Sequence, residues 1–149
     1  MNQIHILLVE DNEGDILLTK EAFEEGKIVN KISIVRDGKA ALDFLEKKAE
    51  FQHAERPDLI LLDVNLPKMN GHEVLEYIKT SVQLRTIPVI MLTTSSSEND
   101  ITCSYKHYAN CFITKPVEMD SFLEVVSSIE NFWISIVRLP CQSHRHAER

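Results

Sequence analysis

The chain has 149 residues, 44% of them hydrophobic and 26% charged, which is ordinary for a globular domain in water. This length suits one domain that buries about two-thirds of its unfolded surface. The formal net charge of −7 argues against a dedicated binder of nucleic acid or of anionic membranes. The sequence begins Met-Asn-Gln and continues with a short apolar run, which predicts no signal peptide, no membrane span and a cytoplasmic protein.

The cysteines and the last histidines do not indicate a metal site. Cys103, Cys111 and Cys141 are odd in number and lack metal-ligand spacing, which favours reduced thiols. His144 and His146 lie near the end of the chain, where a solvated tail is favoured over a pair of metal ligands.

Two strands and two helices are predicted in the first third of the chain. The run from Ile4 to Val9 predicts a first strand, followed by Glu10-Asp11 and a helix to about Glu25 that stops at Gly26. We expect four residues of this helix to face inward: Leu17, Leu18, Ala22 and Phe23.

The second strand is predicted over Lys31 to Arg36, and its polar ends favour an edge of the sheet. Asp37-Gly38 turns into a second helix, and Lys47 to Arg56 is expected to be a ragged helix end and a loop. The inward residues of that helix are expected to be Ala41, Leu42, Phe44 and Leu45.

The most informative stretch is Pro57 to Gly71. Its unbroken apolar run Leu59-Ile60-Leu61-Leu62 predicts a strand that is covered on both faces, as in the middle of a parallel sheet. Asp63 ends this strand, and the turn signals Leu66-Pro67 and Asn70-Gly71 follow. A helix with Val74, Leu75 and Ile78 on one face is expected next. Open α/β sheets place their ligand chemistry at such strand ends.

The remaining chain predicts two further strands and two helices. Val89 to Leu92 is a strand that ends at Thr93-Thr94, and a helix is expected over about Glu98 to Tyr108. Cys111-Phe112-Ile113 predicts a short fifth strand before Thr114-Lys115-Pro116. A last helix begins near Glu118 and is expected to continue as far as Arg138.

This alternation predicts an α/β fold with a doubly wound, five-stranded parallel sheet in the order 2-1-3-4-5, which is flavodoxin-like and carries an extended C-terminal helix. We expect one domain over residues 1–140 and a disordered tail over 141–149. The strand order brings Glu10-Asp11, Asp63, Thr93 and Lys115 to one rim.

The residues at this rim are those of a phosphoryl-transfer site. Three carboxylates repel one another unless a cation binds, and oxygen ligands, including the backbone carbonyl of Asn65, suit Mg²⁺. Asp63 can then attack as a carboxylate nucleophile, while the cation and the Lys115 ammonium neutralise phosphoryl charge. The Thr93 hydroxyl can hydrogen-bond a phosphoryl oxygen.

In these residues the chain resembles the receiver domains of two-component response regulators over Ile4 to Ser128. The resemblance implies that Glu10 and Asp11 hold Mg²⁺ (or Mn²⁺) together with Asp63 and the Asn65 carbonyl. It also implies that Asp63 is the phosphoacceptor, that Thr93 and Phe112 form the switch pair, and that Lys115 is the site lysine, with a cis bond to Pro116. Two departures are Glu10, where Asp is commoner, and Thr94, where a smaller residue is usual.

A second resemblance concerns the ends of the sequence. The Lys47 to Arg56 insertion, the stretch Ala109 to Pro116 and the ending Phe132 to Pro140 are similar to stand-alone regulators that pair with bacterial, especially cyanobacterial, phytochrome kinases. This implies light-dependent phosphorylation by a bilin-carrying histidine kinase.

Three functions compete for this sequence. The first is a switch that is phosphorylated on Asp63 and changes its protein-interaction surface; it is not an enzyme, apart from its own Mg²⁺-dependent phosphorylation and slow dephosphorylation. The second is a receiver-like scaffold that binds its kinase without phosphorylation, and the third is a phosphatase with an Asp nucleophile. The complete set of Asp63, Thr93 and Lys115 argues against the scaffold, and the lack of an Asp at position 65 argues against the phosphatase. No DNA-binding segment follows, so output is expected through protein contacts or phosphoryl relay.

The end of the chain predicts a homodimer. Met119 to Arg138 would make a helix of about 30 Å, longer than the strands it covers. Phe132, Trp133, Ile136 and Val137 would then leave an apolar stripe in water, so we expect a dimer through the fourth helix, fifth strand and last helix. The alternative is a helix that breaks at Asn131 and folds back.

Overall fold

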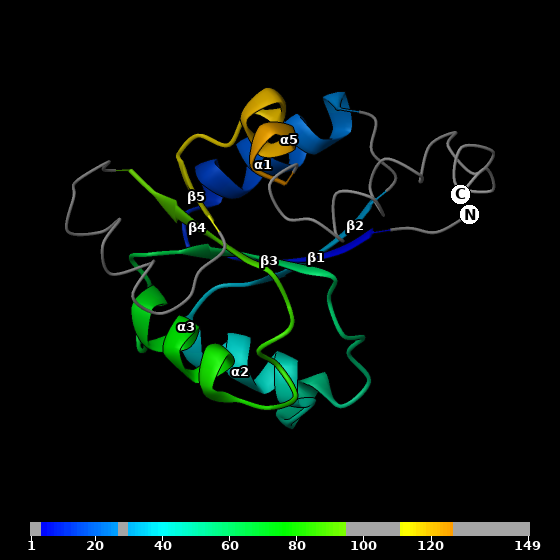
Figure 1. The fold of residues 1–149 in the computed structure, drawn as a ribbon, viewed down its shortest axis with the longest axis vertical. Helices are drawn as coiled ribbons and strands as arrows, with labels where there is room; N and C mark the ends of the chain where they lie inside the picture. Colours follow the sequence, from blue (N-terminus) through cyan, green and yellow to red (C-terminus); the bar gives the residue numbers. More distant parts are fainter. Residues whose placement is uncertain (1–3, 27–29, 95–110, 127–149) are drawn as a thin grey trace, which may run out of the picture.

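The computed structural model describes residues 4–26, 30–94 and 111–126, which form a parallel sheet covered by helices on both faces (Figure 1). The sheet has five strands in the order β2-β1-β3-β4-β5, as the sequence predicts. The strands are β1 (Ile4–Val9), β2 (Asn30–Val35), β3 (Leu59–Asp63), β4 (Val89–Thr93) and β5 (Cys111–Thr114). The helices are α1 (Glu13–Glu25), α2 (Gly38–Glu46), α3 (Gly71–Thr80) and α5 (Met119–Val126), with a 3-10 helix η1 (Ala49–Phe51).

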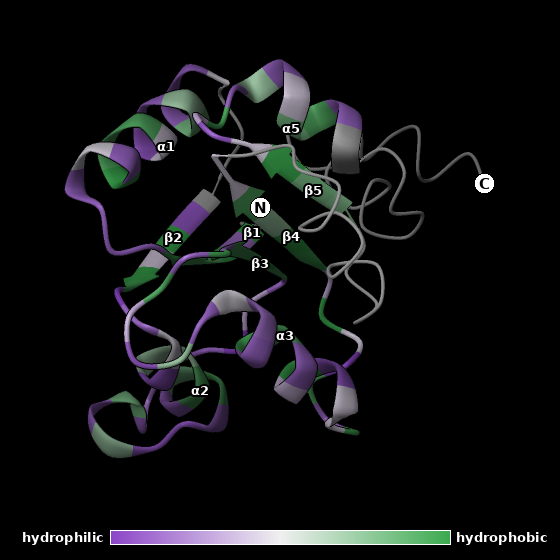
Figure 2. Cartoon of the chain, turned by 90° about the vertical axis from the view of Figure 1, so that its left-hand side faces the viewer, coloured by the Kyte–Doolittle hydropathy of each residue, from purple (hydrophilic) through white to green (hydrophobic). Residues whose placement is uncertain are grey.

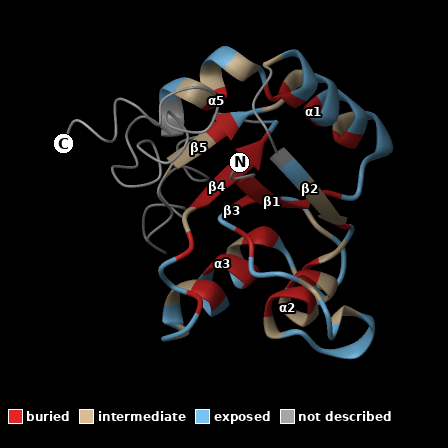
Figure 3. Ribbon diagram, turned by 90° about the vertical axis from the view of Figure 1, so that its right-hand side faces the viewer, coloured by how far each residue is buried: buried red, intermediate tan, exposed pale blue. Residues whose placement is uncertain are grey.

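The inner strands are buried because helices cover both faces of the sheet. Helices α1 and α5 lie on one face, and α2 and α3 lie on the other (Figure 1). Every residue of β1, β3 and β4 is buried (Figure 3), which accounts for their unbroken apolar runs. In Figure 2 the apolar residues of β4 and β5 lie between the helix layers, and polar residues dominate the outer side of α3.

The inward face of α1 differs from the expectation. Leu17 and Leu18 are 57% and 47% exposed, whereas Ile16, Thr19 and Phe23 are buried. The prediction that Leu17 and Leu18 face inward is therefore wrong. A helix advances 3.6 residues per turn, so only one stripe can reach the sheet, and the register of α1 places Thr19 in that stripe. Ala22 is half-buried, and Phe23 packs edge-on against Phe122 of α5.

Side-chain caps start the helices that carry the site loops. The Asn12 side chain accepts a hydrogen bond from the Asp15 N–H of α1 at 2.9 Å, and the Asp37 side chain accepts one from the Ala40 N–H of α2 at 2.7 Å. Asn70 and Glu73 form a reciprocal capping box at the start of α3. These caps satisfy backbone donors that have no partner within the helix.

Gly26 follows the last residue of α1, as expected, but its backbone is right-handed with φ −71°. A Cβ atom at this position would lie 2.5 Å from Cγ of Met119 in α5. Glycine here leaves room for the Met119 side chain to pack against the end of α1, and it does not serve a left-handed helix end.

The Lys47 to Arg56 segment is held at the amino ends of the strands, opposite the predicted rim at their carboxyl ends. It contains η1, which the prediction of a ragged helix end and loop did not include. The Arg56 guanidinium donates to the Gln83 carbonyl at 2.8 Å and to Thr86 Oγ1 at 2.9 Å. The buried His5 ring in β1 lies 2.8 Å from Ser33 Oγ and 3.3 Å from the Arg56 carbonyl. Segment 47–56 is thus tied both to β1 and to the loop before β4.

Several expectations lie outside the described residues. These are the helix over Glu98 to Tyr108, the continuation of the last helix to Arg138, the stripe of Phe132, Trp133, Ile136 and Val137, and the tail 141–149. The domain limit at residue 140 stays a prediction. Within the described ranges, no helix has the length and apolar character to cross a membrane.

Candidate functional site

Strand register brings the predicted site residues to one edge of the sheet. Val9 pairs with Leu62, so Glu10 and Asp63 leave neighbouring strands at the same level. Asp63 pairs with Leu92, directly before Thr93. The Lys115 N–H donates to the Thr93 carbonyl at 2.7 Å, which continues the ladder between β4 and β5. The carboxyl ends of four parallel strands thus meet at this rim, as the sequence predicts.

Three carboxylates form the centre of the site. Glu10, Asp11 and Asp63 each offer one oxygen, and these oxygens lie within 4.8 Å of one another. Glu10 and Asp63 are only 1% and 2% exposed, whereas Asp11 is exposed. The Glu10 carboxylate also accepts the Asn12 N–H at 3.2 Å, and Asp63 accepts the Asn65 N–H at 3.2 Å. Backbone at the start of each following loop therefore orients both buried carboxylates.

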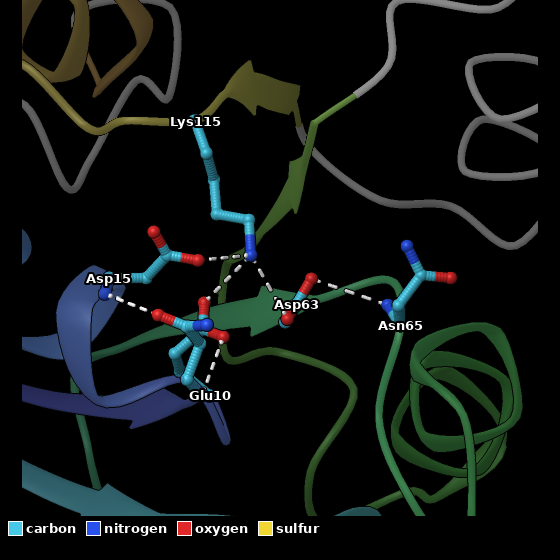
Figure 4. A network of polar contacts seen from close by, with 6 residues as sticks. Glu10, Asp15, Asp63, Asn65 and Lys115 are labelled. Atoms are coloured by element: carbon cyan, nitrogen blue, oxygen red, sulfur yellow. Dashed lines mark hydrogen bonds and ion pairs between the residues drawn. The ribbon is translucent and has the colours of Figure 1, made fainter.

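Lys115 joins this acidic group through its ammonium, and its side chain is 9% exposed (Figure 4). It extends from the end of β5 and reaches between Asp15 and Asp63. Lys115 Nζ lies 3.0 Å from Asp15 Oδ2, 3.1 Å from Glu10 Oε1 and 3.2 Å from Asp63 Oδ2. The three N–H bonds of the ammonium thus have three carboxylate acceptors: Glu10 directly after β1, Asp15 in α1 and Asp63 at the end of β3.

Burial and charge perturb the titration of two groups. The pKa of Glu10 is raised to about 7, chiefly by burial and further by a hydrogen bond with Asp63 and by the charge of Asp63, while hydrogen bonds from Lys115 and the Asn12 N–H act to lower it. Burial alone would lower the pKa of Lys115, but hydrogen bonds to Asp15 and Glu10 and the charge of Asp63 outweigh it and raise this pKa above its ordinary value. Lys115 is therefore a permanent cation, and one ammonium does not fully stabilise the ionised form of Glu10.

The donor set fits a hard divalent cation. All the clustered side-chain ligands are carboxylate oxygens, which Mg²⁺ and Mn²⁺ prefer. Two of them are buried, and the raised pKa of Glu10 indicates that its ionised form lacks sufficient positive charge nearby. A divalent cation would supply that charge.

The remaining predicted residues lie around this centre. Thr93 is buried at the end of β4, and Thr94 beside it is exposed. Phe112 pairs with Met91 in the ladder and is partly buried against the apolar cluster beneath α2 and α3. The Lys115-Pro116 peptide bond is cis, as the resemblance implies.

Asp15 was missed by the sequence analysis. It occupies the first turn of α1, three residues after the capping Asn12, and it is the nearest carboxylate to Lys115. An acidic residue in a first helical turn is usually explained by the helix dipole, so its type alone predicts no contact with a distant lysine. The position of Asp15 in the sequence could have indicated this contact, because the first turn of α1 lies at the rim.

The loop after Asp63 is fixed by two close backbone approaches. A Cβ atom on Gly71 would lie 2.3 Å from the Asp63 carbonyl oxygen, and one on Gly38 would lie 2.0 Å from the Met69 carbonyl oxygen. The Gly71 N–H also donates to the Val64 carbonyl at 2.9 Å. Glycine at position 71 therefore lets the loop between β3 and α3 fold back onto the end of β3, and glycine at position 38 lets the same loop pack closely against the start of α2.

A parallel sheet with a buried Asp, an acidic pair, a Thr and a Lys at its carboxyl rim defines a receiver-type signalling domain. The family model for the response regulator receiver domain matches residues 6–127. The chain therefore belongs to the response regulator receiver domain family, which consists of signalling proteins.

Several relatives and solved structures similar to this chain are response regulators. Response regulator Rcp1 of Synechocystis sp. is 44% identical over 135 residues, which cover 91% of this chain and 92% of Rcp1. The structure of the Mn(2+)-bound form of Rcp1 has a TM-score of 0.74 with 43% identity, over 93% of this chain and 99% of that chain. The phosphorylated cyanobacterial phytochrome response regulator RcpA gives a TM-score of 0.76 with 45% identity, over 93% and 99%. The bacteriophytochrome response regulator RtBRR gives 0.81 with 41% identity, over 99% and 90%.

Proposed function

We propose that this protein is a phosphorylation-dependent switch in which Asp63 accepts a phosphoryl group from a histidine kinase. The observation that carries the proposal is the Asp63 carboxylate itself, which is 2% exposed at the carboxyl end of β3 and lies 3.2 Å from the Lys115 ammonium. Its other neighbours, Glu10 and Asp11, complete an oxygen set for a divalent cation. A nucleophile, a fixed cation and a metal site at one point are the requirements of phosphoryl transfer.

The chain's own residues supply most of this chemistry. A carboxylate oxygen of Asp63 forms the new bond to phosphorus, and the bond from phosphorus to the donor atom breaks. Lys115, held by its three carboxylate contacts, neutralises charge on the transferred group without having to move far. A bound Mg²⁺ or Mn²⁺, held by Glu10, Asp11, Asp63 and the Asn65 backbone carbonyl, would neutralise the rest of that charge.

Acetyl phosphate with Mg²⁺, followed by intact mass measurement, tests the proposal. A switch accumulates one phosphoryl group per chain. It stays unlabelled when the divalent cation is chelated before acetyl phosphate is added. A scaffold that never becomes phosphorylated would stay unlabelled with Mg²⁺ present. A phosphatase would release phosphate with continued turnover and would not accumulate label.

We further propose a phytochrome-type sensor kinase as the phosphodonor. Support comes from the relatives, since RcpA and RtBRR are a phytochrome and a bacteriophytochrome response regulator, and each match covers at least 90% of both compared chains. Phosphoryl transfer from a bilin-carrying histidine kinase should exceed transfer from an unrelated sensor kinase under the same conditions. Equal rates from both kinases would contradict the pairing.

The exposed leucines of α1 give a prediction about kinase transfer. Leu18 is 47% exposed and borders a groove of about 760 Å³, whose lining includes Pro116 and Met119 after β5. Because this surface adjoins the rim, a kinase that delivers a phosphoryl group to Asp63 is expected to cover it. Leu18→Ser should slow transfer from the kinase about tenfold, since buried apolar anchors dominate interface energies. It should leave labelling by acetyl phosphate unchanged, because a small donor needs no docking surface.

The matched control for that experiment is Val82→Ser. Val82 is 75% exposed in the segment between α3 and β4, which leads to the amino end of β4 and not to the rim. Val82→Ser lowers the hydropathy of the surface as Leu18→Ser does. It should leave both transfer from the kinase and labelling by acetyl phosphate unaffected. If Val82→Ser slows the kinase as much as Leu18→Ser does, the face of α1 is not the docking surface.

Switching is expected to couple Thr93 to Phe112. A phosphoryl group on Asp63 adds roughly 1.5–2 negative charges, by analogy with other phosphorylated side chains. Thr93 should turn to donate to it, and Phe112, which is only partly buried, should move into the vacated space. Thr93→Ala should still accept phosphate but lose the phosphorylation-dependent change in partner binding, measured by titration with the kinase. An unchanged response would refute the coupling.

Self-association through the fourth helix, fifth strand and last helix is also proposed, on the apolar stripe of Phe132, Trp133, Ile136 and Val137. Sedimentation at micromolar concentration should detect a dimer of the full chain and a monomer after truncation at Asn131. A monomer in both phosphorylation states of the full chain would rule the dimer out.

A further inference from the structure

Asp15 differs from the other carboxylates that contact Lys115. Its Oδ2 atom lies 3.0 Å from Lys115 Nζ, yet Asp15 does not belong to the group of Glu10, Asp11 and Asp63 whose oxygens cluster within 4.8 Å. Its side chain is 28% exposed, against 3% for Asp63. Asp15 therefore lies at the outer side of the lysine, away from the centre of the acidic group (Figure 4).

The backbone on both sides of this ion pair is fixed. The Asp15 N–H donates to Asn12 Oδ1 at 2.9 Å, which sets the first turn of α1. The Lys115 N–H donates to the Thr93 carbonyl at 2.7 Å, which sets the start of the lysine side chain. Lys115 is thus bound through its ammonium to Asp15 and through its backbone N–H to β4.

A bound divalent cation would change the balance among the three contacts. Glu10 and Asp63 belong to the metal-ligand group and also accept from Lys115, so the ammonium and the metal compete for their oxygens. Asp15 also contacts the ammonium but does not belong to the metal-ligand group. It can keep the ammonium paired while Glu10 and Asp63 turn to the cation.

We infer that Asp15 is a positioning residue that draws the Lys115 ammonium toward α1 and thereby reduces its competition with the divalent cation for Glu10 and Asp63. The part of this inference that concerns phosphoryl transfer rests on the proposed function, but the part that concerns metal affinity does not require a phosphoryl group. Without Asp15, the partners left to the ammonium among the described residues are the buried carboxylates of Glu10 and Asp63, and a metal must displace it from them.

The loss of negative charge at position 15 would by itself also weaken metal binding. Any negative charge near a cation site favours the cation, whether or not Lys115 is present. The two explanations differ in one respect: positioning requires the lysine, and a general charge effect does not. A double-mutant cycle between Asp15 and Lys115 separates them.

The experiment is a Mn²⁺ titration of the full chain, followed by electron paramagnetic resonance of the free ion. Asp15→Asn should weaken Mn²⁺ binding about three- to fivefold, the effect expected of one well-formed, partly exposed ion pair. Lys115→Met alone should tighten binding, because a competing cation is removed. In the Lys115→Met background, Asp15→Asn should change affinity less than twofold, within the additivity error of such cycles.

Matched variants guard against indirect effects. Glu13→Gln removes a carboxylate from the same first turn, where Glu13 is exposed and pairs with Arg36, and it should leave Mn²⁺ affinity unchanged. Asp15→Ser, a residue well suited to a helix start, replaces Asp15→Asn if the latter does not fold. Asp15→Glu keeps the charge and should retain most of the affinity.

The outcomes are distinct. If Asp15→Asn weakens Mn²⁺ binding equally with and without Lys115, or not at all, the positioning role is overturned while the proposed function stands. If the wild-type chain binds Mn²⁺ with the expected cycle but never takes a phosphoryl group from acetyl phosphate, the proposed function fails and the positioning of Lys115 stands.

Discussion

Replacing Asp63 with Asn is expected to abolish phosphorylation by acetyl phosphate and by any kinase. The amide has nearly the same shape, so the buried end of β3 can be kept, but an amide oxygen is a far weaker nucleophile than a carboxylate. The expected loss is complete within detection by intact mass, because Asp63 is the proposed phosphoacceptor and an amide cannot replace its carboxylate as the nucleophile.

Asp58→Asn is the matched control. Asp58 directly precedes β3, at the opposite end of the strand, and is exposed. Its substitution makes the same chemical change on the same strand and should leave labelling at the wild-type level. Label that persists in Asp63→Asn, or that disappears in Asp58→Asn with folding intact, would contradict Asp63 as the phosphoacceptor.

The Asp63→Asn substitution has a second expected effect, on the stability of the metal-free protein. Glu10 and Asp63 are buried next to each other, and the charge of Asp63 helps to raise the pKa of Glu10. Removing one of two like charges relieves this repulsion, so metal-free Asp63→Asn should unfold at a urea concentration equal to or above that of the wild type. A midpoint above that of the wild type would show that the pair of buried carboxylates destabilises the folded state when no cation is bound.

Much of the fold could be predicted from periodicity. The unbroken runs in β1, β3 and β4 predicted strands covered on both faces, and the polar ends of β2 predicted an edge; both expectations are confirmed. The rim followed from these strands, because parallel strands that end in polar residues bring those residues together. Asp63 and Lys115 could therefore be placed side by side from the sequence, although 52 positions separate them.

What could not be predicted depends on helix rotation and on backbone contacts between segments. The sequence does not show how α1 is turned on the sheet, and so Leu17 and Leu18 were placed inside while Asp15 was left without a role. The close approaches at Gly38 and Gly71 were likewise hidden, because a turn signal such as Asn70-Gly71 has the same letters whether or not a carbonyl lies against the glycine.

Gly71→Ala tests how much the fold depends on one of these contacts. Gly71 is the first residue of α3, where Ala would ordinarily be favoured over Gly by roughly 1 kcal/mol. Here the added Cβ would lie 2.3 Å from the Asp63 carbonyl oxygen and 2.8 Å from the Val64 Cα atom. Both are backbone atoms at the end of a central strand, so they cannot rotate away. We expect a loss of about 3 kcal/mol in the free energy of unfolding, as for overpacking in a rigid core, measured by urea denaturation.

Gly14→Ala is the control, since Gly14 also lies in the first turn of a helix next to the site. A Cβ atom there would meet the Asn12 side chain oxygen at 3.2 Å, and a side chain can give way by a few tenths of an ångström. Its effect on the free energy of unfolding should stay within about 1 kcal/mol, because helix propensity offsets the small contact. The Gly71 variant should also label more slowly with acetyl phosphate, since the atom its Cβ meets is the carbonyl of the phosphoacceptor. Equal unfolding midpoints for Gly71→Ala and the wild type would show that the end of β3 yields, and that the loop after Asp63 is not held by this contact.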